Sequence, residues 1–200
     1  MLTRRPLGFD HVALREHMID FEAFAEAEAE SPLVLDEDDT EGEGAWHLFC
    51  CLGTTIRTAG SKAAFRRVDF DYVLAFGRLG QQLGADRLLV VSSTGAKASS
   101  LNFYMRTKGE MEKALEALGL PRLYLVRPPL LLADRQERRV GEELGAVVLG
   151  ALRPLLAGPL LGWRPIRVEA VAKAMVRLAA REHGKRAVFE PAALHRLAEK

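Results

Sequence analysis

Tyr104 and Lys108 are the residues of this chain whose types and spacing suggest acid–base chemistry. Residues four apart lie on one face of a helix, so their phenol and ammonium groups can reach a common acceptor. A nearby cation favours the tyrosinate and moves a pKa of about 10 toward neutral pH, where tyrosine works as a general acid or base. The same spacing also arises when two polar residues merely share a helix face, so the surrounding sequence has to decide.

Two serines, Ser92 and Ser93, supply that context, because they end an apolar run and precede the segment that carries Tyr104. In an open parallel sheet, ligands lie beyond the carboxyl ends of the strands, so a hydroxyl at this position points into a crevice. Serine at a strand end is also an ordinary turn former. In combination with the Tyr104 and Lys108 spacing, the serines favour a site over a turn.

The elements that must position these groups alternate along the chain. Short continuous apolar runs at residues 46–52, 87–93 and 123–127 are typical of strands buried on both faces. Between them, residues 65–83 and 102–118 carry apolar positions at intervals of three and four, which predicts amphipathic helices. Strand, helix, strand, helix, strand predicts an α/β protein with a doubly wound parallel sheet.

The rest of the chain continues this pattern within one domain of 200 residues. The expected later elements are helices at residues 140–152 and 168–182, a strand at 186–190 and a final helix from Ala192. The acidic run at residues 36–43 is interpreted as a solvated loop. Gly77, Gly80 and Gly84 lie within a helix ahead of a strand, the wrong context for a phosphate loop, and predict close packing of helix on sheet.

The bulk composition narrows the classes of partner. A net charge of +1 gives no global attraction to nucleic acid or to an acidic membrane surface. No apolar run reaches the roughly 18 to 20 residues of a spanning helix, and no secretory signal follows Met1. Cys50 and Cys51 are adjacent, which suits neither an ordinary disulfide nor a zinc site. We therefore expect a cytoplasmic protein.

At these residues the chain resembles the short-chain dehydrogenase/reductase family, and more closely its atypical Tat-interacting-protein-like branch. The resemblance runs from Thr3 to about Leu144. It is carried by Cys50-Cys-Leu-Gly-Thr-Thr55, Ala59-Gly-Ser61, Phe65-Arg-Arg-Val-Asp69, Ser92-Ser93, Tyr104-x-x-x-Lys108-Gly-Glu110, Arg127-Pro128 and Asp134-Arg-Gln-Glu137. It implies one NAD(P)-binding Rossmann-like domain over residues 1–200, with residues 128–200 forming the small substrate-side and C-terminal part.

The resemblance also implies roles for the relay residues. Tyr104 would exchange a proton with the substrate oxygen, and Lys108 would hold the nicotinamide ribose and lower the tyrosine pKa. Ser92 or Ser93 would hydrogen-bond the carbonyl. The hydride belongs to the cofactor.

Further residues are assigned to the cofactor by the same resemblance. The strand that ends in Leu52, Gly53 and Thr54 would run past it, and Arg127-Pro128 would end the strand beside the nicotinamide. Without the resemblance, these residues are equally well explained as tight strand ends.

Arg4 and Arg5 sit where the second strand of this fold ends, within reach of an adenosine 2′-phosphate. This placement favours NADP over NAD, although an exposed basic terminus has the same composition. Asp20 follows a short expected strand around residues 18–19 and matches a position that contacts adenine in the family.

A fold of this type opens with a strand, a glycine-rich turn and a helix whose N-terminal amides hold the pyrophosphate. The sequence begins inside the second strand of that scheme, with residues 2–5, so we expect a sheet truncated at its N-terminus. Loss of the phosphate-binding amides weakens cofactor binding on the order of a thousandfold. Two explanations stay open: a wrong start site or trimmed chain, which we favour, or a remnant that has lost catalysis.

The leading hypothesis is an NADP-dependent oxidoreductase acting on a carbonyl or alcohol by a Ser/Tyr/Lys relay. The alternative is a non-catalytic nucleotide-sensing or protein-binding member of the same fold. The scarcity of polar residues after Arg127 indicates an apolar small-molecule substrate. A lipid or membrane role for the apolar residues 147–161 is less favoured than a buried helix pair or subunit contact. The five histidines are scattered, so no metal is expected.

Overall fold

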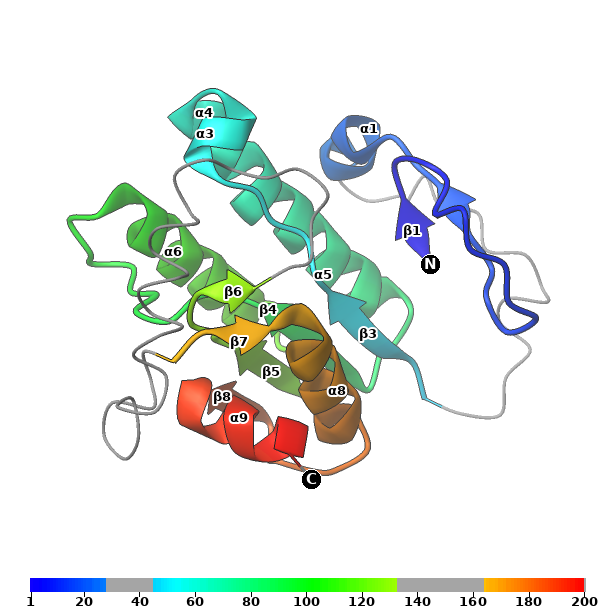
Figure 1. Ribbon diagram of the computed structural model, residues 1–200. Helices are drawn as coiled ribbons and strands as arrows, with labels where there is room; N and C mark the ends of the chain where they lie inside the picture. Colours follow the sequence, from blue (N-terminus) through cyan, green and yellow to red (C-terminus); the bar gives the residue numbers. More distant parts are fainter. Residues whose placement is uncertain (28–44, 133–163, 200) are drawn as a thin grey trace.

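The computed structural model of the chain describes residues 1–27, 45–132 and 164–199, and its centre is a parallel sheet (Figure 1). The strands are β3 (His47–Cys50), β4 (Arg87–Val91), β5 (Leu123–Val126) and β8 (Arg186–Phe189), paired in that order and all parallel. The three strands expected around residues 46–52, 87–93 and 123–127 and the strand expected at 186–190 are thereby confirmed.

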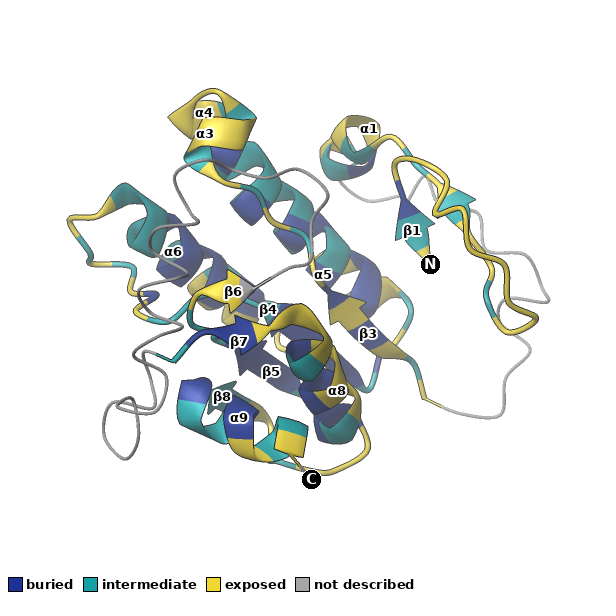
Figure 2. Cartoon of the chain, in the orientation of Figure 1, coloured by how far each residue is buried: buried dark blue, intermediate teal, exposed yellow. Residues whose placement is uncertain are grey.

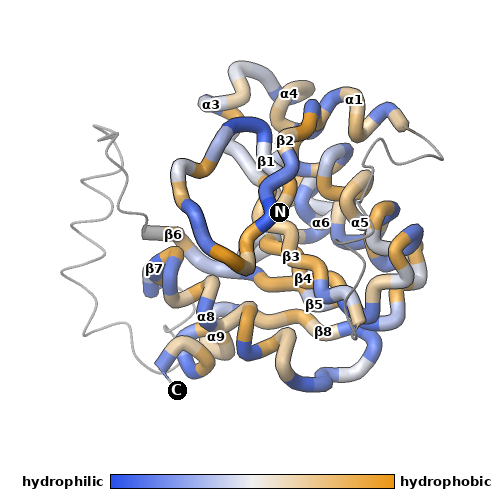
Figure 3. Tube along the Cα trace, turned by 90° about the vertical axis from the view of Figure 1, so that its right-hand side faces the viewer, coloured by the Kyte–Doolittle hydropathy of each residue, from blue (hydrophilic) through white to orange (hydrophobic). Residues whose placement is uncertain are grey.

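Helices cover both faces of this sheet. Figure 1 shows α5 (Tyr72–Gln82) and α6 (Phe103–Ala117) on one side, and α8 (Val168–Ala179) and α9 (Pro191–Glu199) on the other. Side chains alternate along β4 accordingly: Leu88 and Val90 join the core under α5 and α6, whereas Leu89 joins the core under α8 and α9. The prediction of a doubly wound parallel sheet is confirmed. In Figure 3 the tube is coloured hydrophobic along β3 and β4, as expected of strands in the core.

The expectation that the first of these strands is buried on both faces is wrong. In β3, Leu48 and Cys50 are buried, but Phe49 keeps 40% of its surface exposed and His47 is exposed (Figure 2). The reason is that β3 lies at the edge of the four-stranded sheet, and among the described residues the core under α8 and α9 contains no residue of β3. Only the face of β3 that points toward α5 is therefore buried.

The long helix expected at residues 65–83 is built from three segments. α4 (Lys62–Arg66), the π-helical turn η1 (Arg67–Asp71) and α5 follow one another without a break, after the short helix α3 (Ile56–Ala59). A π turn inserts one residue into the helical ladder and changes the direction in which side chains leave the helix. Here it turns Asp69 inward, where only 1% of its surface is exposed.

The helix glycines serve packing, as predicted. A Cβ atom at Gly77 would lie 2.6 Å from Cδ2 of Leu115 on α6, and one at Gly80 would lie 2.9 Å from Cδ1 of Leu48 on β3. Gly84 has a different role, since its φ of 60° ends the helix in the left-handed region.

The N-terminal residues form a separate unit. β1 (Leu2–Thr3) and β2 (His17–Met18) pair in parallel and confirm the strands expected at residues 2–5 and 18–19. Within the described residues, this pair is not hydrogen-bonded to the four-stranded sheet. It is followed by α1 (Phe21–Glu26), which packs on α5 through a small cluster around Phe24.

The C-terminal elements agree with expectation where the structure describes them. α8, β8 and α9 confirm the elements expected from residue 168 onward, and β6 (Leu131–Leu132) pairs with β7 (Ile166–Arg167). The helix expected at residues 140–152, the acidic loop at 36–43 and the apolar stretch at 147–161 lie outside the described residues. None of the described helices has the length and apolarity to cross a membrane.

Candidate active site

Lys108 lies at the centre of the site, on α6, where only 3% of its surface is exposed. Its Nζ lies 2.8 Å from Oδ1 of Asp69 in η1. This contact is an ion pair without hydrogen-bond alignment, because Oδ1 has no well-directed hydrogen bond among the described residues. The other carboxylate oxygen of Asp69 accepts a hydrogen bond of 2.8 Å from the amide of Thr54.

The ion pair lies beside the carboxyl end of β3. A Cβ atom placed on Gly53 would stand 3.4 Å from Oδ1 of Asp69 and 3.8 Å from Nζ of Lys108. Because glycine has no side chain, the exposed backbone of Gly53 lies directly beside the Lys108 and Asp69 pair. Leu52 points to the core under α5. Two cofactor residues expected from the sequence, Gly53 and Thr54, thus meet Lys108 in space.

Tyr104 lies one turn earlier on α6 and is half-buried. Its ring packs on Phe65 of α4, with 5.3 Å between the centroids. Within the described part of the chain, the phenol oxygen has no hydrogen-bond partner. The side chain is therefore held by the packing of its ring on α4.

The two serines differ in what surrounds them. Ser92 is buried and donates a hydrogen bond of 2.6 Å to Oε1 of Glu112 on α6. The hydroxyl of Ser93, half-buried, makes one long contact of 3.4 Å to the carbonyl of Thr94. Ser92 is committed to an internal bond, whereas Ser93 has a hydroxyl that a ligand can use.

Arg127 belongs to the network around Glu112. Its Nε lies 2.9 Å from Oε1 of Glu112, and its Nη1 lies 2.9 Å from Oε1 of Glu190. The hydrogen bond to Glu112 is the main reason that the pKa of Arg127 is raised. Arg127 therefore acts in this structure as a clamp between β5, α6 and the start of α9.

The loop between β4 and α6 is held by backbone hydrogen bonds to the segment after β5 and to α6. The amide of Thr94 donates to the carbonyl of Pro128 over 3.1 Å, and the amide of Lys97 donates to the carbonyl of Met105 over 3.1 Å. A Cβ atom on Gly109 of α6 would lie 2.2 Å from the backbone nitrogen of Ala98. Pro128 thus contributes its backbone to the site, and the loop and helix are in direct backbone contact.

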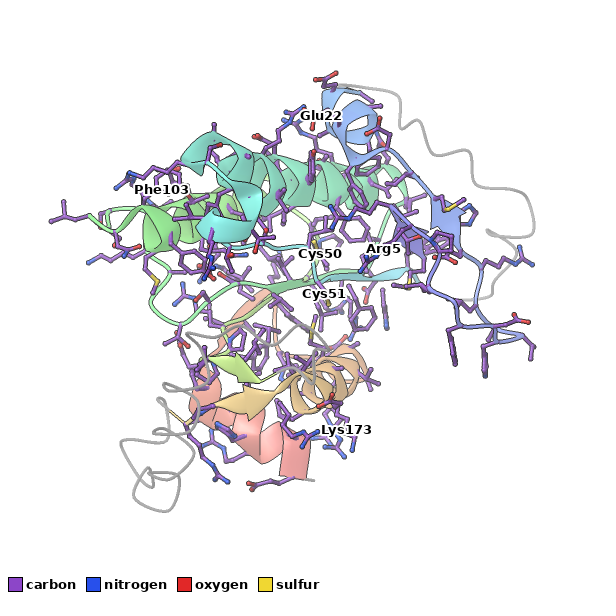
Figure 4. All side chains as sticks on the ribbon, turned by 45° about the horizontal axis from the view of Figure 1, so that its top comes forward. Arg5, Glu22, Cys50, Cys51, Phe103 and Lys173 are labelled. Carbon is purple, nitrogen blue, oxygen red and sulfur yellow. The ribbon has the colours of Figure 1, made fainter. Side chains whose placement is uncertain are left out.

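The residues expected at the adenosine end lie in the N-terminal unit. Arg4 and Arg5 follow β1 and are exposed, and Figure 4 shows Arg5 between the N-terminal strands and Cys50 and Cys51. The side chain of Asp20 accepts a hydrogen bond of 2.8 Å from the amide of Glu22 and so caps the start of α1. A structural role for Asp20 was not anticipated, although aspartate before a helix is a common N-cap.

The sequence assigned no role to Asp69, which lies in the quoted motif of residues 65–69, or to Glu112. Glu112 lies four residues after Lys108, on the same helix face, which is a signal that was available. Asp69 sits among apolar residues of a helical stripe, and a charge there indicates a buried partner. Cys50 was left without a role, and burial raises its pKa to about 12, so it stays a neutral thiol.

Comparison with known proteins finds chains of similar sequence. The chain is 39% identical over 155 residues to HTATIP2 of Rattus norvegicus, covering 76% of this chain and 59% of that protein. It is 31% identical over 156 residues to the mitochondrial protein FMP52 of Debaryomyces hansenii, covering 76% and 65%. These relatives and the solved structures support an atypical protein that is similar to the Tat-interacting protein and like the short-chain dehydrogenases/reductases. It spans less than two thirds of the length of these relatives, and no family model matches it.

Solved structures support the family's fold. A structure of MoeE5 in complex with UDP-glucuronic acid and NAD matches with a TM-score of 0.63 and 18% identity, covering 95% of this chain and 66% of that one. The holo form of a GalE-like L-threonine dehydrogenase from Cupriavidus necator matches with a TM-score of 0.58 and 14% identity, covering 94% and 68%. These likenesses confirm the Rossmann-like fold.

One expectation is overturned by the relatives. We expected a cytoplasmic protein, but the fungal members are named as mitochondrial proteins, among them FMP52 of Debaryomyces hansenii and of Coccidioides immitis. The cytoplasmic expectation was wrong. It rested largely on two adjacent cysteines that suit no ordinary disulfide, and this pattern does not separate one reducing compartment from another.

Proposed function

We propose that the chain supplies the nicotinamide end of an NAD(P)-dependent oxidoreductase that acts on a carbonyl or an alcohol. The observation that carries this proposal is the buried ammonium of Lys108, held beside the exposed backbone of Gly53 at the carboxyl end of β3. Ligands of open parallel sheets lie at this edge. Proteins of the same fold have been solved with NAD and with NADP, among them MoeE5 and a dTDP-4-dehydrorhamnose reductase.

The residues present fit a nicotinamide cofactor, because the lack of a side chain at Gly53 leaves room over the Lys108 and Asp69 pair. Lys108 would hold the ribose, and the backbone of Gly53 and Thr54, with Pro128 across the sheet, would line the binding edge. Bound there, the cofactor supplies the hydride.

The proton is handled by the chain's own residues. In the reducing direction, Tyr104 gives its phenol proton to the carbonyl oxygen, and the ammonium of Lys108 on the same helix face stabilises the tyrosinate that remains. Ser93 donates a hydrogen bond to the same oxygen, since its hydroxyl lacks a strong partner among the described residues. In the oxidising direction the proton moves back to Tyr104.

NADP is proposed over NAD. Arg4 and Arg5 are exposed at the end of β1, where guanidinium groups bind a phosphate well. A small apolar substrate is proposed, because few polar residues follow Arg127 in the sequence.

The test is Tyr104→Phe, assayed for oxidation of NADPH and of NADH with a panel of apolar aldehydes and ketones. Turnover is expected to fall by at least about a hundredfold, because the proton donor is lost. Cofactor binding and thermal stability should stay the same, since the phenol oxygen makes no hydrogen bond within the described residues. Tyr72→Phe is the matched control, because Tyr72 donates to Glu22 on the far side of α5. Unchanged turnover in Tyr104→Phe would refute the relay.

A second candidate is a nucleotide sensor without turnover. It is favoured by the internal partners of the polar residues: Ser92 bonds Glu112, and Lys108 pairs with Asp69. Wild-type chain that is stabilised by NADPH but turns over no substrate of the panel would support this candidate over the enzyme.

A further inference from the structure

The connection between β1 and β2 lacks the helix that usually joins two parallel strands. Such strands need a crossover of about a dozen residues or more, and most crossovers contain a helix. Here residues 4–16 form a long loop without helix or strand (Figure 1). Most residues of this loop are exposed, so packing does little to fix it. Its shape therefore depends on hydrogen bonds.

Glu16, the last residue of this loop, closes it with one carboxylate. Its Oε1 accepts a hydrogen bond of 2.7 Å from the hydroxyl of Thr3, which is only 8% exposed. The same oxygen accepts a hydrogen bond of 3.1 Å from the amide of Leu7, and Oε2 accepts a longer one of 3.4 Å. The carboxylate therefore joins both ends of the segment that consists of residues 4–6.

The backbone next to Glu16 is fixed by the pairing of the two strands. The amide of His17 donates a hydrogen bond of 2.8 Å to the carbonyl of Met1. The amide of Ile19 donates one of the same length to the carbonyl of Thr3. Because Glu16 directly precedes these bonds, its carboxylate is tied to a paired strand and not to the exposed part of the loop.

The two arginines of this segment have no acidic partner among the described residues. Arg4 and Arg5 are exposed, and neither forms an ion pair there. Figure 4 shows Arg5 between the N-terminal strands and Cys50 and Cys51. Two guanidinium groups on one fixed segment suit a phosphate, because each can donate paired hydrogen bonds to its oxygens.

We propose that Glu16 is a positioning residue for the adenosine 2′-phosphate, because it fixes the segment of Arg4 and Arg5 before the nucleotide binds. This role rests on the NADP preference of the proposed function, whereas the fixed segment is a property of the free chain. A segment that is ordered on folding does not have to be ordered on binding. The charge of Glu16 itself repels a phosphate, so its hydrogen bonds and its charge have opposite effects on binding.

The first test measures exchange of the Leu7 amide with water by NMR. In Glu16→Ala this amide loses its acceptor, and its exchange should become about tenfold faster. Glu16→Gln keeps a side-chain oxygen that Thr3 and Leu7 can share, so its exchange should stay near that of the wild type. Equal exchange rates in the wild type and in Glu16→Ala would overturn the proposal.

The second test compares the binding of adenosine 2′,5′-bisphosphate and adenosine 5′-monophosphate by NMR titration. The wild type should prefer the bisphosphate by about tenfold or more, since guanidinium groups bind the 2′-phosphate. Glu16→Ala should lower this preference by about three- to tenfold, whereas Glu16→Gln should keep or raise it. Both variants lack the charge, but only glutamine keeps the hydrogen bonds. Equal preferences in the two variants would overturn the proposal, because a role through charge alone changes both alike.

Asp10→Ala is the matched control. Asp10 is an exposed acid of the same loop, without a hydrogen bond or ion pair within the described residues. This variant should leave the exchange of Leu7 unchanged and should not lower the preference for the bisphosphate. A loss like that of Glu16→Ala would mean that any substituted acid disturbs the loop, and would overturn the proposal.

The failure of this proposal can be told apart from the failure of the proposed function. Wild-type chain that binds the two nucleotides equally would overturn the role of Glu16 together with the NADP preference. Turnover in the Tyr104→Phe assay would still decide whether the chain is an oxidoreductase, because that assay uses both NADPH and NADH.

Discussion

At the scale of single residues, the site depends on which of two adjacent serines is free. Side chains alternate along a strand, and Ser92 continues the face of Leu88 and Val90, which points to α6. That face brings Ser92 to Glu112. Ser93 leaves on the other side and has only its long contact with Thr94 among the described residues. The sequence places both at the strand end without distinguishing them.

The two serines should therefore respond differently to alanine. Ser92→Ala removes a donor from the buried Glu112 and is expected to cost about 1 to 3 kcal/mol of stability in urea unfolding. Ser93→Ala should leave stability within about 0.5 kcal/mol of wild type, while lowering turnover on the order of a hundredfold because one donor to the developing oxyanion is lost. The reverse pattern would assign the carbonyl contact to Ser92.

Spacing identifies residues whose partners are near in the chain, and it identified Tyr104 with Lys108. The resemblance, not spacing, pointed to Gly53 and Thr54, and the structure brings these two beside the Lys108 and Asp69 pair. Spacing did not find Asp69, because the contact to Lys108 joins two helices separated by a strand. The partner of a buried charge becomes visible only when the helices are placed on the sheet.

At the scale of elements, α6 carries the site because its backbone can approach the preceding loop. Asn102 caps its start by accepting a hydrogen bond of 3.2 Å from the amide of Met105. Gly109 lies against the backbone at Lys97 and Ala98, closer than any side chain permits. The loop that follows Ser93 is thereby fixed relative to Tyr104 and Lys108.

Gly109→Ala tests this close approach. Alanine is more favourable than glycine in a helix by about 1 kcal/mol. Its Cβ would, however, lie 2.2 Å from the backbone nitrogen of Ala98, and this clash cannot be relieved by rotating a side chain. We expect a net loss of about 1 to 3 kcal/mol and faster proteolysis of residues 94–101. Lys113→Ala, exposed on the same helix, is the control and should change neither. A stabilised Gly109→Ala variant would mean that loop and helix separate freely.

Two features of the elements were not predictable from periodicity. The apolar stripe over residues 65–83 predicts a helix. The one residue inserted in η1 changes the spacing of the apolar positions too little to be detected in the sequence. The apolar run before Gly53 predicts a strand, but it does not say that β3 ends the sheet. Burial of the second face depends on which helices reach an edge strand, and that is a property of the assembled layers.

At the scale of the whole molecule, the described part of the N-terminal unit meets the rest of the fold through α1, which contacts α5 and the neighbouring turn η1. Within the described residues no hydrogen bond links β1 and β2 to the four-stranded sheet, and α1 packs on α5 instead. The hydroxyl of Tyr72 on α5 donates to Glu22 on α1. Burial, followed by this hydrogen bond, raises the pKa of Tyr72 to about 12, so the phenol remains a donor at neutral pH.

Phe24 is the part of this contact that should decide whether the N-terminal unit stays docked, because it is 3% exposed and packs with Ala75 and Leu79. Removal of a buried phenylalanine ring costs about 3 to 5 kcal/mol. In Phe24→Ala the loss should fall mainly on the N-terminal unit, because the buried residues of this cluster are not among those of the two larger cores.

Hydrogen exchange separates the two units. The amide of Ile19 bonds the carbonyl of Thr3 over 2.8 Å, and the amide of Ser92 bonds the carbonyl of Val126 over 2.7 Å. Phe24→Ala should speed exchange at Ile19 by roughly a hundredfold to a few thousandfold and leave Ser92 unchanged, whereas Phe9→Ala, with 65% of its surface exposed, should affect neither. Equal acceleration at Ile19 and Ser92 would mean that the two sheets unfold as one unit, and Arg4 and Arg5 would then be fixed to the site as firmly as Lys108.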